Sequence, residues 1–585
     1  MAPRASTDES FFLFLLHLFL NLLSNITTLT HVYDAPIITL PNITLSGVYA
    51  ADFNITIYRR IPFAASTAPP NRFSPPQPLP PYTNSSSSSL QIYNTNQTLP
   101  NCPLPDGSGS EDCLYLGIYT RPWNANDTLR PVVVVFHGGA YMYAGSAPSL
   151  NQLSPFGYPA LNVSSTDNNF VLVYPNYRLG ALGFLPGQAM YDDPQAALNP
   201  GLLDQRAALQ WVQSHIANFG GDPHNVTIFG QSAGGGSVIA HALAANEKGS
   251  RSSSSSKTLF RRVVASSPFW PHTYAYNDPE AEAVYDDFVT LTGCRRGARP
   301  NSGNGAEVST VECMRNLDLR ILTAASAALE NAYMYPGYVW APVLDGSFLT
   351  QTLTSAVSAR TLNADLVFAL FNANEGESFV DPSLLLDDSL DGIGDGADGG
   401  LGTGPLPYNG TAAGFDAWLA DLLPRLNATQ TTAVKQLYPA EGTTDVAGWS
   451  WNTTFGRASY LYRDLVLACP AYWIASTAPG TGYLAQWTVP PANHVTPFVW
   501  YWNTIDTSDP TQLLRYYGYT GAIASFFETG DPNAHKLTND STPGVPDLTT
   551  GLQFITAPDG FRTQSMPILQ SRCAFWLANA KSIPI

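Results

Sequence analysis

Charged side chains are scarce in this sequence, and most of those present are acidic. Asp, Glu, Lys and Arg make up only 12% of the 585 residues, and 45 acidic against 28 basic residues give a formal net charge of -17. Such a surface repels phosphate backbones and anionic lipid headgroups. We therefore expect no nucleic-acid partner and no stable membrane insertion, and small or neutral substrates are favoured.

Spacings typical of metal sites are also missing. The six cysteines form no Cys-x-x-Cys pair, and no cluster of histidines accompanies them, so we expect no bound metal. An even number of cysteines in an oxidising compartment indicates three disulfides. Spacing favours the two pairs that close short loops and leaves the remaining two cysteines for each other: Cys102 with Cys113, Cys294 with Cys313, and Cys469 with Cys573.

A glycine-rich segment, residues 394–399, matches the dinucleotide-binding fingerprint in its letters alone. No strand pattern directly precedes it, and its aspartates would repel a pyrophosphate. The segment belongs to an Asp- and Gly-rich stretch, residues 381–407, which we interpret as a solvated, flexible loop, with an acidic calcium loop as the alternative. The sequence therefore predicts no cofactor.

The apolar run near the N-terminus, residues 11–23, is too short to span a bilayer comfortably. We interpret residues 1–24 as a cleaved signal peptide, with a membrane anchor as the alternative. Asn-x-Ser/Thr sequons are dense, which agrees with a secreted, extracellular glycoprotein. They begin at Asn25, Asn42, Asn54, Asn84, Asn96, Asn126, Asn162, Asn225, Asn409, Asn427, Asn452 and Asn539. We expect Asn225 to be a chance match, because it adjoins a strand that should be buried.

Short apolar runs alternate with helical patterns along the rest of the chain. A helical pattern over residues 204–219 places its apolar side chains on one face and ends at Gly220, a plausible C-cap. Strands separated by helices predict an α/β fold, a large, mainly parallel sheet flanked by helices with helical and loop insertions, in a single domain over residues 25–585. The expected strands are residues 132–136, 170–174, 226–229, 366–371 and 483–489.

The segment Gly230-Gln-Ser232-Ala-Gly234 lies between an expected strand and an apolar helical stretch. A Gly-x-Ser-x-Gly turn in that setting lets the serine adopt a strained conformation and raises its hydroxyl above the sheet. The helix N-terminus beneath it favours developing negative charge. We therefore predict that Ser232 is a nucleophile, the alternative being an ordinary serine in a glycine-rich turn.

A serine nucleophile needs hydrogen-bond donors for the oxyanion that forms on the substrate. His137-Gly-Gly-Ala140 follows the expected strand 132–136, and its small residues let backbone N–H groups approach a substrate oxygen. We assign the oxyanion hole to the amides of Gly139, Ala140 and Ala233. His137 itself is expected to hold this loop in place.

The catalytic base should be a histidine that follows the acid in the chain. His241 lies within the helix after the nucleophile, His272 precedes every good acid, and His535 sits in a polar loop. His494 follows a strand-like run and two prolines and precedes an aromatic-rich stretch. We therefore predict His494 as the base, with a buried structural histidine as the alternative.

The acid should lie just beyond the end of another strand. Glu375 is the first carboxylate after the expected strand 366–371, and Glu377 competes with it. We favour Glu375, because Gly376 beside it should relax the turn that aims a carboxylate at the imidazole. Its task would be to hold the histidine tautomer and to stabilise the imidazolium.

Ordered motifs over much of the chain resemble the type-B carboxylesterases, α/β hydrolases that include cholinesterases and some fungal lipases. The resemblance implies the same three catalytic residues and the same cysteine pairs as above. One departure is Ala140, which replaces the third glycine of the usual His-Gly-Gly-Gly run. The matching motifs are Arg60-Ile-Pro-Phe-Ala64, Arg72-Phe-Ser-Pro-Pro76, Glu111-Asp-Cys-Leu-Tyr-Leu116, His137-Gly-Gly139, Asn176-Tyr-Arg-Leu-Gly180, Leu182-Gly-Phe-Leu185, Phe219-Gly-Gly-Asp-Pro223, Gly230-Gln-Ser-Ala-Gly234 and Thr529-Gly-Asp-Pro-Asn533.

The first cysteine loop, residues 103–112, contains no aromatic residue and is too short to cover a pocket. The resemblance therefore implies neither a choline esterase nor a lid-gated lipase. We expect a secreted carboxylic ester hydrolase that forms an acyl-enzyme, and Phe269 and Trp270 either line its acyl pocket or pack in the core. The alternatives are a lipase for longer acyl glycerides and an inactive binding or adhesion protein on the same fold. The specific ester and the oligomeric state stay open.

Overall fold

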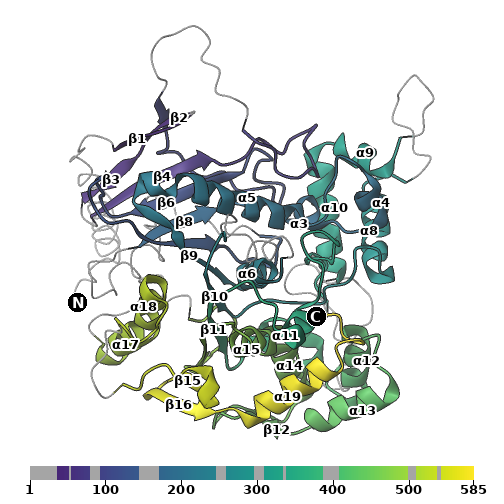
Figure 1. Cartoon of the computed structure of the whole chain (residues 1–585). Helices are drawn as coiled ribbons and strands as arrows, with labels where there is room; N and C mark the ends of the chain where they lie inside the picture. The colour runs from purple at the N-terminus through teal and green to yellow at the C-terminus, as the bar shows by residue number, and fades with distance from the viewer. Residues whose placement is uncertain are drawn as a thin grey trace, which may run out of the picture.

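The central feature of the computed structural model is one large twisted sheet (Figure 1). The structure describes residues 36–41, 43–51, 54–79, 92–143, 170–244, 258–295, 308–333, 337–386, 408–497, 509–535 and 542–585. Within them the sheet has eleven strands. In spatial order these are β16 (Gly560–Ser565), β15 (Leu552–Ala557), β14 (Gly482–Trp487), β11 (Leu366–Asn372), β10 (Arg262–Ser266), β9 (Gly221–Gln231), β7 (Arg130–Phe136), β8 (Val171–Pro175), β6 (Tyr115–Thr120), β4 (Ile55–Pro62) and β3 (Val48–Ala50).

From β8 to β15, each strand is parallel to its neighbours, and the pairs at both ends of the sheet are antiparallel. The predicted class, a mainly parallel sheet flanked by helices, is therefore confirmed. The parallel strands are apolar along their length because helices cover both faces. All carboxyl ends of these parallel strands lie along one edge, where β9, β11 and β14 lead into the loops that carry the candidate site.

Alternate residues of β7 serve the two faces of the sheet. Val132 and Val134 belong to the larger buried cluster, with the helices α5 (Pro200–His215) and α6 (Ala233–Leu243). Val133 and Val135 belong to a second cluster, with α18 (Gly521–Thr529) on the opposite face. Figure 1 shows α18 and α6 on opposite sides of the strands. This two-residue period is what a strand buried on both faces requires.

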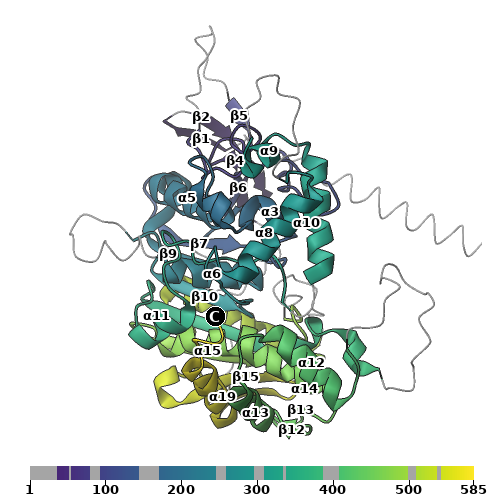
Figure 2. The same cartoon turned by 90° about the vertical axis from the view of Figure 1, so that its right-hand side faces the viewer.

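Further helices surround the carboxyl edge and the C-terminal half of the sheet. Helices α8 and α10 lie side by side and next to α3, as Figure 2 shows. Helix α15 packs against β11 and β14. The bounds are α3 (Gly180–Phe184), α8 (Pro279–Leu291), α9 (Thr310–Arg315), α10 (Leu319–Tyr333), α11 (Leu353–Ala359), α12 (Ala412–Leu422), α13 (Ala428–Leu437), α14 (Thr454–Tyr462), α15 (Cys469–Ser476), α17 (Pro510–Arg515) and α19 (Pro567–Ala578).

The predicted elements are present, with shifted boundaries. All five expected strands occur, as β7, β8, β9, β11 and β14. The expected helix begins earlier, at Pro200, and its last turn, Ile216–Phe219, is a 3-10 helix that ends at Gly220 with φ of 81°. Proline at the first helical position and a left-handed glycine after the last explain these two ends.

The prediction of a flexible loop over residues 381–407 is wrong at the start of that segment, because Pro382–Leu385 form a short 3-10 helix capped by the Asp381 carboxylate. Residues 387–407, the serine-rich segment 252–256 and the expected signal peptide 1–24 lie outside the described residues. Within the described segments, no helix has both the length and the apolar character that crossing a membrane requires.

Three disulfides join the six cysteines in the pairs Cys102–Cys113, Cys294–Cys313 and Cys469–Cys573. The last pair links α15 to α19, across a sequence separation of 104 residues. Sequon Asn225 is half-buried in β9 and Asn409 is also half-buried. The exposed, described sequons are Asn54, Asn96, Asn126, Asn427 and Asn452, and the others lie outside the described residues.

Candidate active site

Ser232 lies at the sharp turn between β9 and α6. Its backbone has φ of 60° and ψ of -127°, a combination that a residue with a Cβ atom adopts only under strain. Such a conformation costs about 1–3 kcal/mol and persists only where the surroundings enforce it. The turn is held by hydrogen bonds from the Ser232 amide to the Ser266 carbonyl, at 3.0 Å, and from the Phe269 amide to the Ser232 carbonyl, at 2.9 Å.

Two glycines beside Ser232 are required by close backbone contact. A Cβ atom on Gly230 would lie 2.2 Å from the carbonyl of Gly234, and one on Gly234 would lie 2.0 Å from the carbonyl oxygen of Phe136. No larger side chain fits at either position without moving a strand or the helix. The glycines of the motif therefore bring α6 close to the sheet and place the serine at its edge.

His494 connects Ser232 to Glu375. The Ser232 hydroxyl lies 2.8 Å from His494 Nε2, and His494 Nδ1 lies 3.1 Å from Glu375 Oε2. The hydroxyl can donate to Nε2 while Nδ1–H donates to the carboxylate, an arrangement that fits one neutral tautomer of the ring. The Glu375 side chain is fully buried and the His494 side chain is 9% exposed. The structure thus brings together three residues that are far apart in the chain.

Glu375 begins a 3-10 turn, Glu375–Ser378, that directly follows β11. Its other oxygen, Oε1, accepts a hydrogen bond from the Asn372 amide at 3.0 Å, which fixes the carboxylate. Gly376 was expected to relax the turn, but its φ is not positive, so the backbone does not need a glycine there for conformational reasons. A Cβ atom there would lie 1.8 Å from the carbonyl oxygen of Ser459, so the glycine permits close packing against α14.

The loop after β7 forms a tight turn that passes close to Ser232, since a Cβ atom on Gly138 would lie 3.1 Å from Ser232 Cβ. Gly139, Ala140 and Tyr141 all have positive φ, at 109°, 53° and 61°. The amides of Gly139, Ala140 and Ala233 donate no hydrogen bond within the part of the chain that the structure describes. Ala233 is the first residue of α6, where amides have no intrahelical acceptor. These three amides are therefore available as donors.

His137 lies at the start of this turn. Burial lowers the pKa of His137 to about 4. Its ring stacks on Tyr177 with centroids 4.2 Å apart, and the Tyr177 hydroxyl donates to the His137 carbonyl at 2.7 Å. These contacts favour the expectation that His137 holds the loop in place.

The other candidate histidines lie elsewhere. His241 is buried in α6, where Nε2 lies 3.1 Å from Gln205 Oε1, and burial lowers the pKa of His241 to about 3. Burial likewise lowers the pKa of His272 to about 4. His535 lies 2.8 Å from a Glu528 carboxylate oxygen, at the far end of α18. No group of three or more His, Cys, Asp or Glu side chains in the described ranges is arranged to hold a metal ion.

The family model described as "Carboxylesterase family" matches residues 34–390, well over half of the chain. The chain belongs to this family. It is a carboxylic ester hydrolase, and the recognition drawn from the motifs is confirmed. The carboxylesterase is 27% identical over 505 residues to "Carboxylesterase patB" of Penicillium expansum, covering 83% of this chain and 79% of the relative. It is 29% identical over 489 residues to "Carboxylesterase patB" of Aspergillus clavatus, covering 80% and 75%.

Solved structures place the carboxylesterase in the α/β-hydrolase fold. The crystal structure of Aspergillus niger EstA matches it with a TM-score of 0.74 and 23% identity, over 94% of this chain and 99% of that one. At this identity the likeness concerns the fold alone. The predicted fold class is therefore confirmed by both the topology and the comparison.

Two residues that touch His494 were missed by the sequence reasoning. The Phe379 ring meets the imidazole edge to face, with centroids 4.7 Å apart, and the Gln231 amide nitrogen lies 3.3 Å from His494 Nε2. Gln231 could have been found, because it precedes the nucleophile at the end of β9. Phe379 could not, because its approach depends on how the turn after Glu375 packs.

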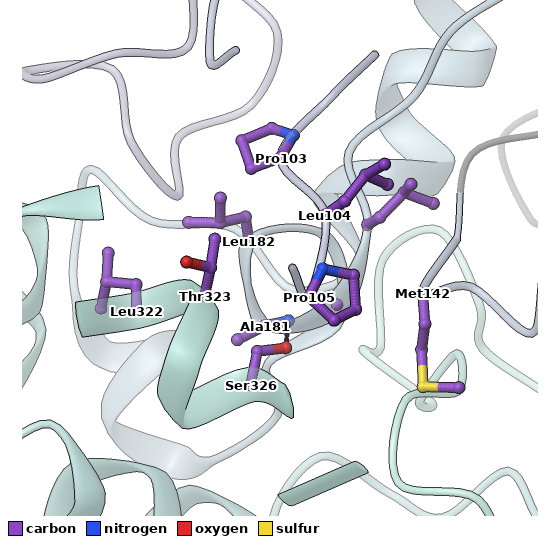
Figure 3. Close-up of a pocket in the computed structure, with 11 residues that line it drawn as sticks. Pro103, Leu104, Pro105, Met142, Ala181, Leu182, Leu322, Thr323 and Ser326 are labelled. Atoms are coloured by element: carbon purple, nitrogen blue, oxygen red, sulfur yellow. Dashed lines mark hydrogen bonds between the residues drawn. The ribbon is translucent and has the colours of Figure 1, made fainter. Parts of the chain in front are cut away.

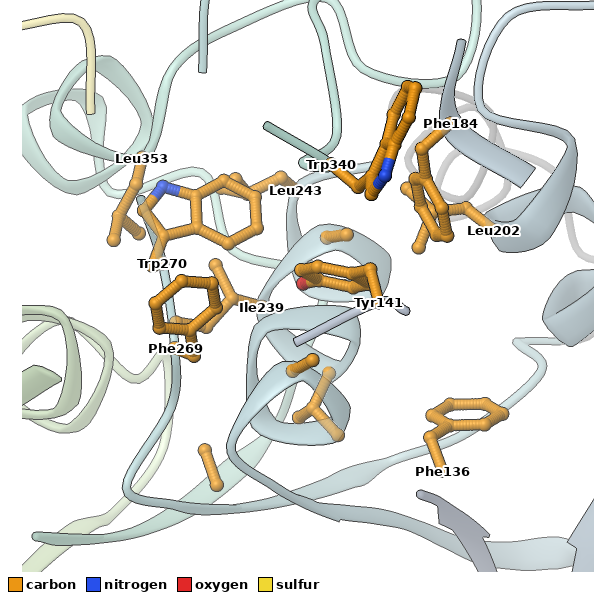
Figure 4. Packing of buried hydrophobic residues seen from close by; sticks show 14 of the residues in the cluster. Phe136, Tyr141, Phe184, Leu202, Ile239, Leu243, Phe269, Trp270, Trp340 and Leu353 are labelled. Atoms are coloured by element: carbon orange, nitrogen blue, oxygen red, sulfur yellow. The ribbon is translucent and has the colours of Figure 1, made fainter. Parts of the chain in front are cut away.

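The two expected pocket residues, Phe269 and Trp270, are both fully buried. Phe269 stacks on Phe379 with ring centroids 5.5 Å apart, so it belongs to the aromatic wall behind His494. Trp270 belongs to the large buried cluster, and Figure 4 shows it beside Leu243. Core packing, one of the two alternatives stated, fits both residues, and Phe269 in addition lies near the site through its contact with Phe379.

Proposed function

We propose that this carboxylesterase is a secreted enzyme that hydrolyses carboxylic esters through an acyl-enzyme on Ser232. The observation that carries this proposal is the chain of two contacts from Ser232 Oγ to His494 Nε2, 2.8 Å, and from His494 Nδ1 to Glu375, 3.1 Å. Those distances are within the range in which a base removes a proton from a nucleophile.

In the proposed first half-reaction, Ser232 Oγ attacks the ester carbonyl carbon while His494 Nε2 takes the hydroxyl proton. The buried Glu375 carboxylate orients the ring and stabilises the imidazolium without becoming protonated. Negative charge develops on the carbonyl oxygen, which the free amides of Gly139, Ala140 and Ala233 can stabilise. The tetrahedral intermediate collapses, and the alcohol leaves with the proton returned by His494.

In the proposed second half-reaction, water takes the place of the alcohol. His494 removes a proton from this water, whose oxygen attacks the acyl carbon, and the acid is released as Ser232 regains its proton. The strained backbone of Ser232 and the three free amides are present before substrate binds. Preorganised donors of this kind supply a large part of the rate enhancement, since no dipole has to reorient during the reaction.

Secretion is supported by the cysteines and by the sequons. Three disulfides form readily on an oxidising route and are rare in reducing compartments. Exposed sequons such as Asn54, Asn126 and Asn452 are accessible to glycosylation. Mass spectrometry of the protein recovered from the culture medium, before and after removal of N-glycans, tests both features.

Labelling with a fluorophosphonate probe tests the catalytic proposal. Wild-type protein should be labelled at Ser232, and Ser232→Ala should be neither labelled nor active while it keeps the melting temperature of the wild type. Unchanged turnover in this variant would remove the proposal. A series of p-nitrophenyl and aromatic esters of graded acyl size then identifies the substrate class, and a rate increase above the solubility limit of a triglyceride would instead indicate a lipase.

A further inference from the structure

The turn that carries the free amides of Gly139 and Ala140 is tied to a neighbouring helix by one buried carboxyl group. Two residues after Tyr141, the hydroxyl of Tyr143 donates a hydrogen bond to Glu330 of α10. Glu330 is only 3% exposed, whereas Tyr143 is 47% exposed. The phenol therefore reaches from the surface into α10, and its ring is not needed to fill the core.

Glu330 depends on Tyr143 for its hydrogen bonding. Within the described residues, no other group donates to this carboxyl group and no cation lies against it. Burial accordingly raises the pKa of Glu330, and the hydrogen bond from Tyr143 opposes that rise. A buried carboxyl group with a single partner holds that partner firmly, because losing it leaves an unsatisfied polar group away from water.

Tyr143 in turn determines the position of Gly139. The amides of Met142 and Tyr143 both donate to the Gly139 carbonyl, each at 2.8 Å. A Cβ atom on Gly139 would lie 2.2 Å from the Tyr143 carbonyl oxygen, so the two backbones are in close contact. Because the Gly139 carbonyl and the Ala140 amide share one peptide group, a displacement of Tyr143 would shift that peptide group together with Gly139.

Helix α10 also supports the middle of the turn, through α3. The Gly180 amide donates to the Tyr141 carbonyl at 2.8 Å, and the next amide, that of Ala181, donates to Ser326 Oγ of α10 at 3.3 Å. Figure 3 shows the hydrogen bond between Ala181 and Ser326, beside a small cavity that residues of α3 and α10 and Met142 help to line. That cavity measures about 10 Å³, room for roughly one water molecule, so α10 backs the turn closely.

We propose that Glu330 is a positioning residue for the acyl transfer proposed above, on which this inference rests. Through Tyr143 it holds the Gly139 and Ala140 amides at the place where the oxyanion forms. Amide donors act on the transition state only when they are preorganised, and small displacements reduce the rate strongly. The loss should therefore appear in kcat and not in KM, because the ground-state ester makes weaker contacts with these amides.

The main test is Tyr143→Phe, which removes only the hydroxyl group of an exposed side chain. We expect kcat on a p-nitrophenyl ester to fall about 10-fold, with KM changed less than about twofold. The affinity for a trifluoromethyl ketone, which forms a tetrahedral adduct on the serine, should fall by the same factor as kcat. Glu330→Leu should lose as much, Glu330→Gln should recover most of the rate because it keeps an acceptor, and the double variant should be no slower than the slower single variant.

The control is Tyr333→Phe on the same helix. The Tyr333 hydroxyl donates to Asp287 at 2.6 Å, so this variant also removes a phenol–carboxylate bond from α10, away from the turn. It should keep the wild-type kcat. Equal kcat in Tyr143→Phe and wild type, or losses that multiply in the double variant, would overturn the proposal.

An increase in KM alone would also overturn it, since Tyr143 would then contact the substrate.

The failure of this inference is distinguishable from failure of the proposed function. If wild-type protein does not react with a fluorophosphonate, the acyl-enzyme proposal fails first. If wild type reacts and Tyr143→Phe behaves identically, only the role of Glu330 fails. Thermal melting identifies any variant that has not folded.

Discussion

Ser232 and His494 meet at one hydrogen bond, yet the chain holds them in different ways. Ser232 sits between two regular elements, β9 and α6, and the glycines next to it are demanded by contacts in the same turn or one strand away. His494 lies in a loop after β14, where Ala492 and Val495 have positive φ of 52° and 64°. Ser232 is thus held between a strand and a helix that the sequence predicts, and His494 by the tertiary contacts of a loop.

The loop of His494 is held by the segment that follows β11. The Asn374 amide donates to the Ala492 carbonyl at 3.0 Å, and Asn372 Nδ2 donates to the Asn493 carbonyl at 2.8 Å. The same segment carries Glu375. One piece of chain therefore supplies the carboxylate and also holds the loop of the imidazole.

The largest effects are expected when Ser232 and His494 are replaced, singly and together. Ser232→Ala and His494→Ala should each lower kcat by about 10⁶-fold, and the double variant should be no worse, because residues of a catalytic unit are not additive. Stopped assays on a p-nitrophenyl ester, with thermal melting as the control for folding, provide the measurement. Losses that multiply would show that the two residues act separately.

Close packing of the Ser232 turn against β7 predicts a stability effect. Gly234→Ala should destabilise the protein by roughly 1–3 kcal/mol and lower kcat, because its methyl group would meet the Phe136 carbonyl at 2.0 Å. Gly117→Ala in β6 is the matched control, since its nearest neighbours lie at 3.5 Å. Denaturant unfolding of both variants measures the difference, and equal midpoints would contradict the steric argument.

Tertiary specification predicts that His494 can be displaced from a distance. Asn372→Ala removes the bond to the Asn493 carbonyl while leaving the Asn372 amide on Glu375. We expect kcat to fall about 10-fold, which corresponds to about 1.4 kcal/mol in the barrier. The rate of fluorophosphonate labelling should fall in parallel. Unchanged kinetics would show that the loop holds its shape without this bond.

Two histidines on the Ser232 side of the site, the half-buried His137 and the fully buried His241, make stability depend on pH. Burial lowers the pKa of His137, in the oxyanion turn, to about 4 and that of His241, in α6, to about 3. The unfolded chain binds these protons below the ordinary histidine pKa of about 6.5, so stability present above that pH is lost as the pH falls toward 4.

Each histidine should contribute a slope of at most about 1.4 kcal/mol per pH unit. His241→Gln should therefore flatten the decline in melting temperature between pH 6.5 and 4, because the variant has no histidine to bind a proton when it unfolds in that range. The measurement is a series of thermal melts over that range. A variant that declines as steeply as wild type would show that His241 does not contribute.

The parts of the site that follow from sequence order could be chosen before the structure was known. Ser232, Glu375 and His494 were selected as a serine on a turn, the first carboxylate after a later strand and a histidine after that. In the structure, Ser232 Oγ lies 2.8 Å from His494 Nε2, and His494 Nδ1 lies 3.1 Å from Glu375 Oε2. Gly376 shows the limit, because its residue type was noticed but its reason, contact with Ser459, lies on a distant helix.

By itself, the sequence determined five of the eleven strands, the Gly-x-Ser-x-Gly turn at Ser232 and the family, because apolar runs and short motifs are written in consecutive residues. Only the tertiary structure decided that Phe379 touches His494 and that Tyr143 reaches Glu330. Those contacts join residues whose separation is set by the packing of whole helices and strands. No local pattern of side chains encodes that packing.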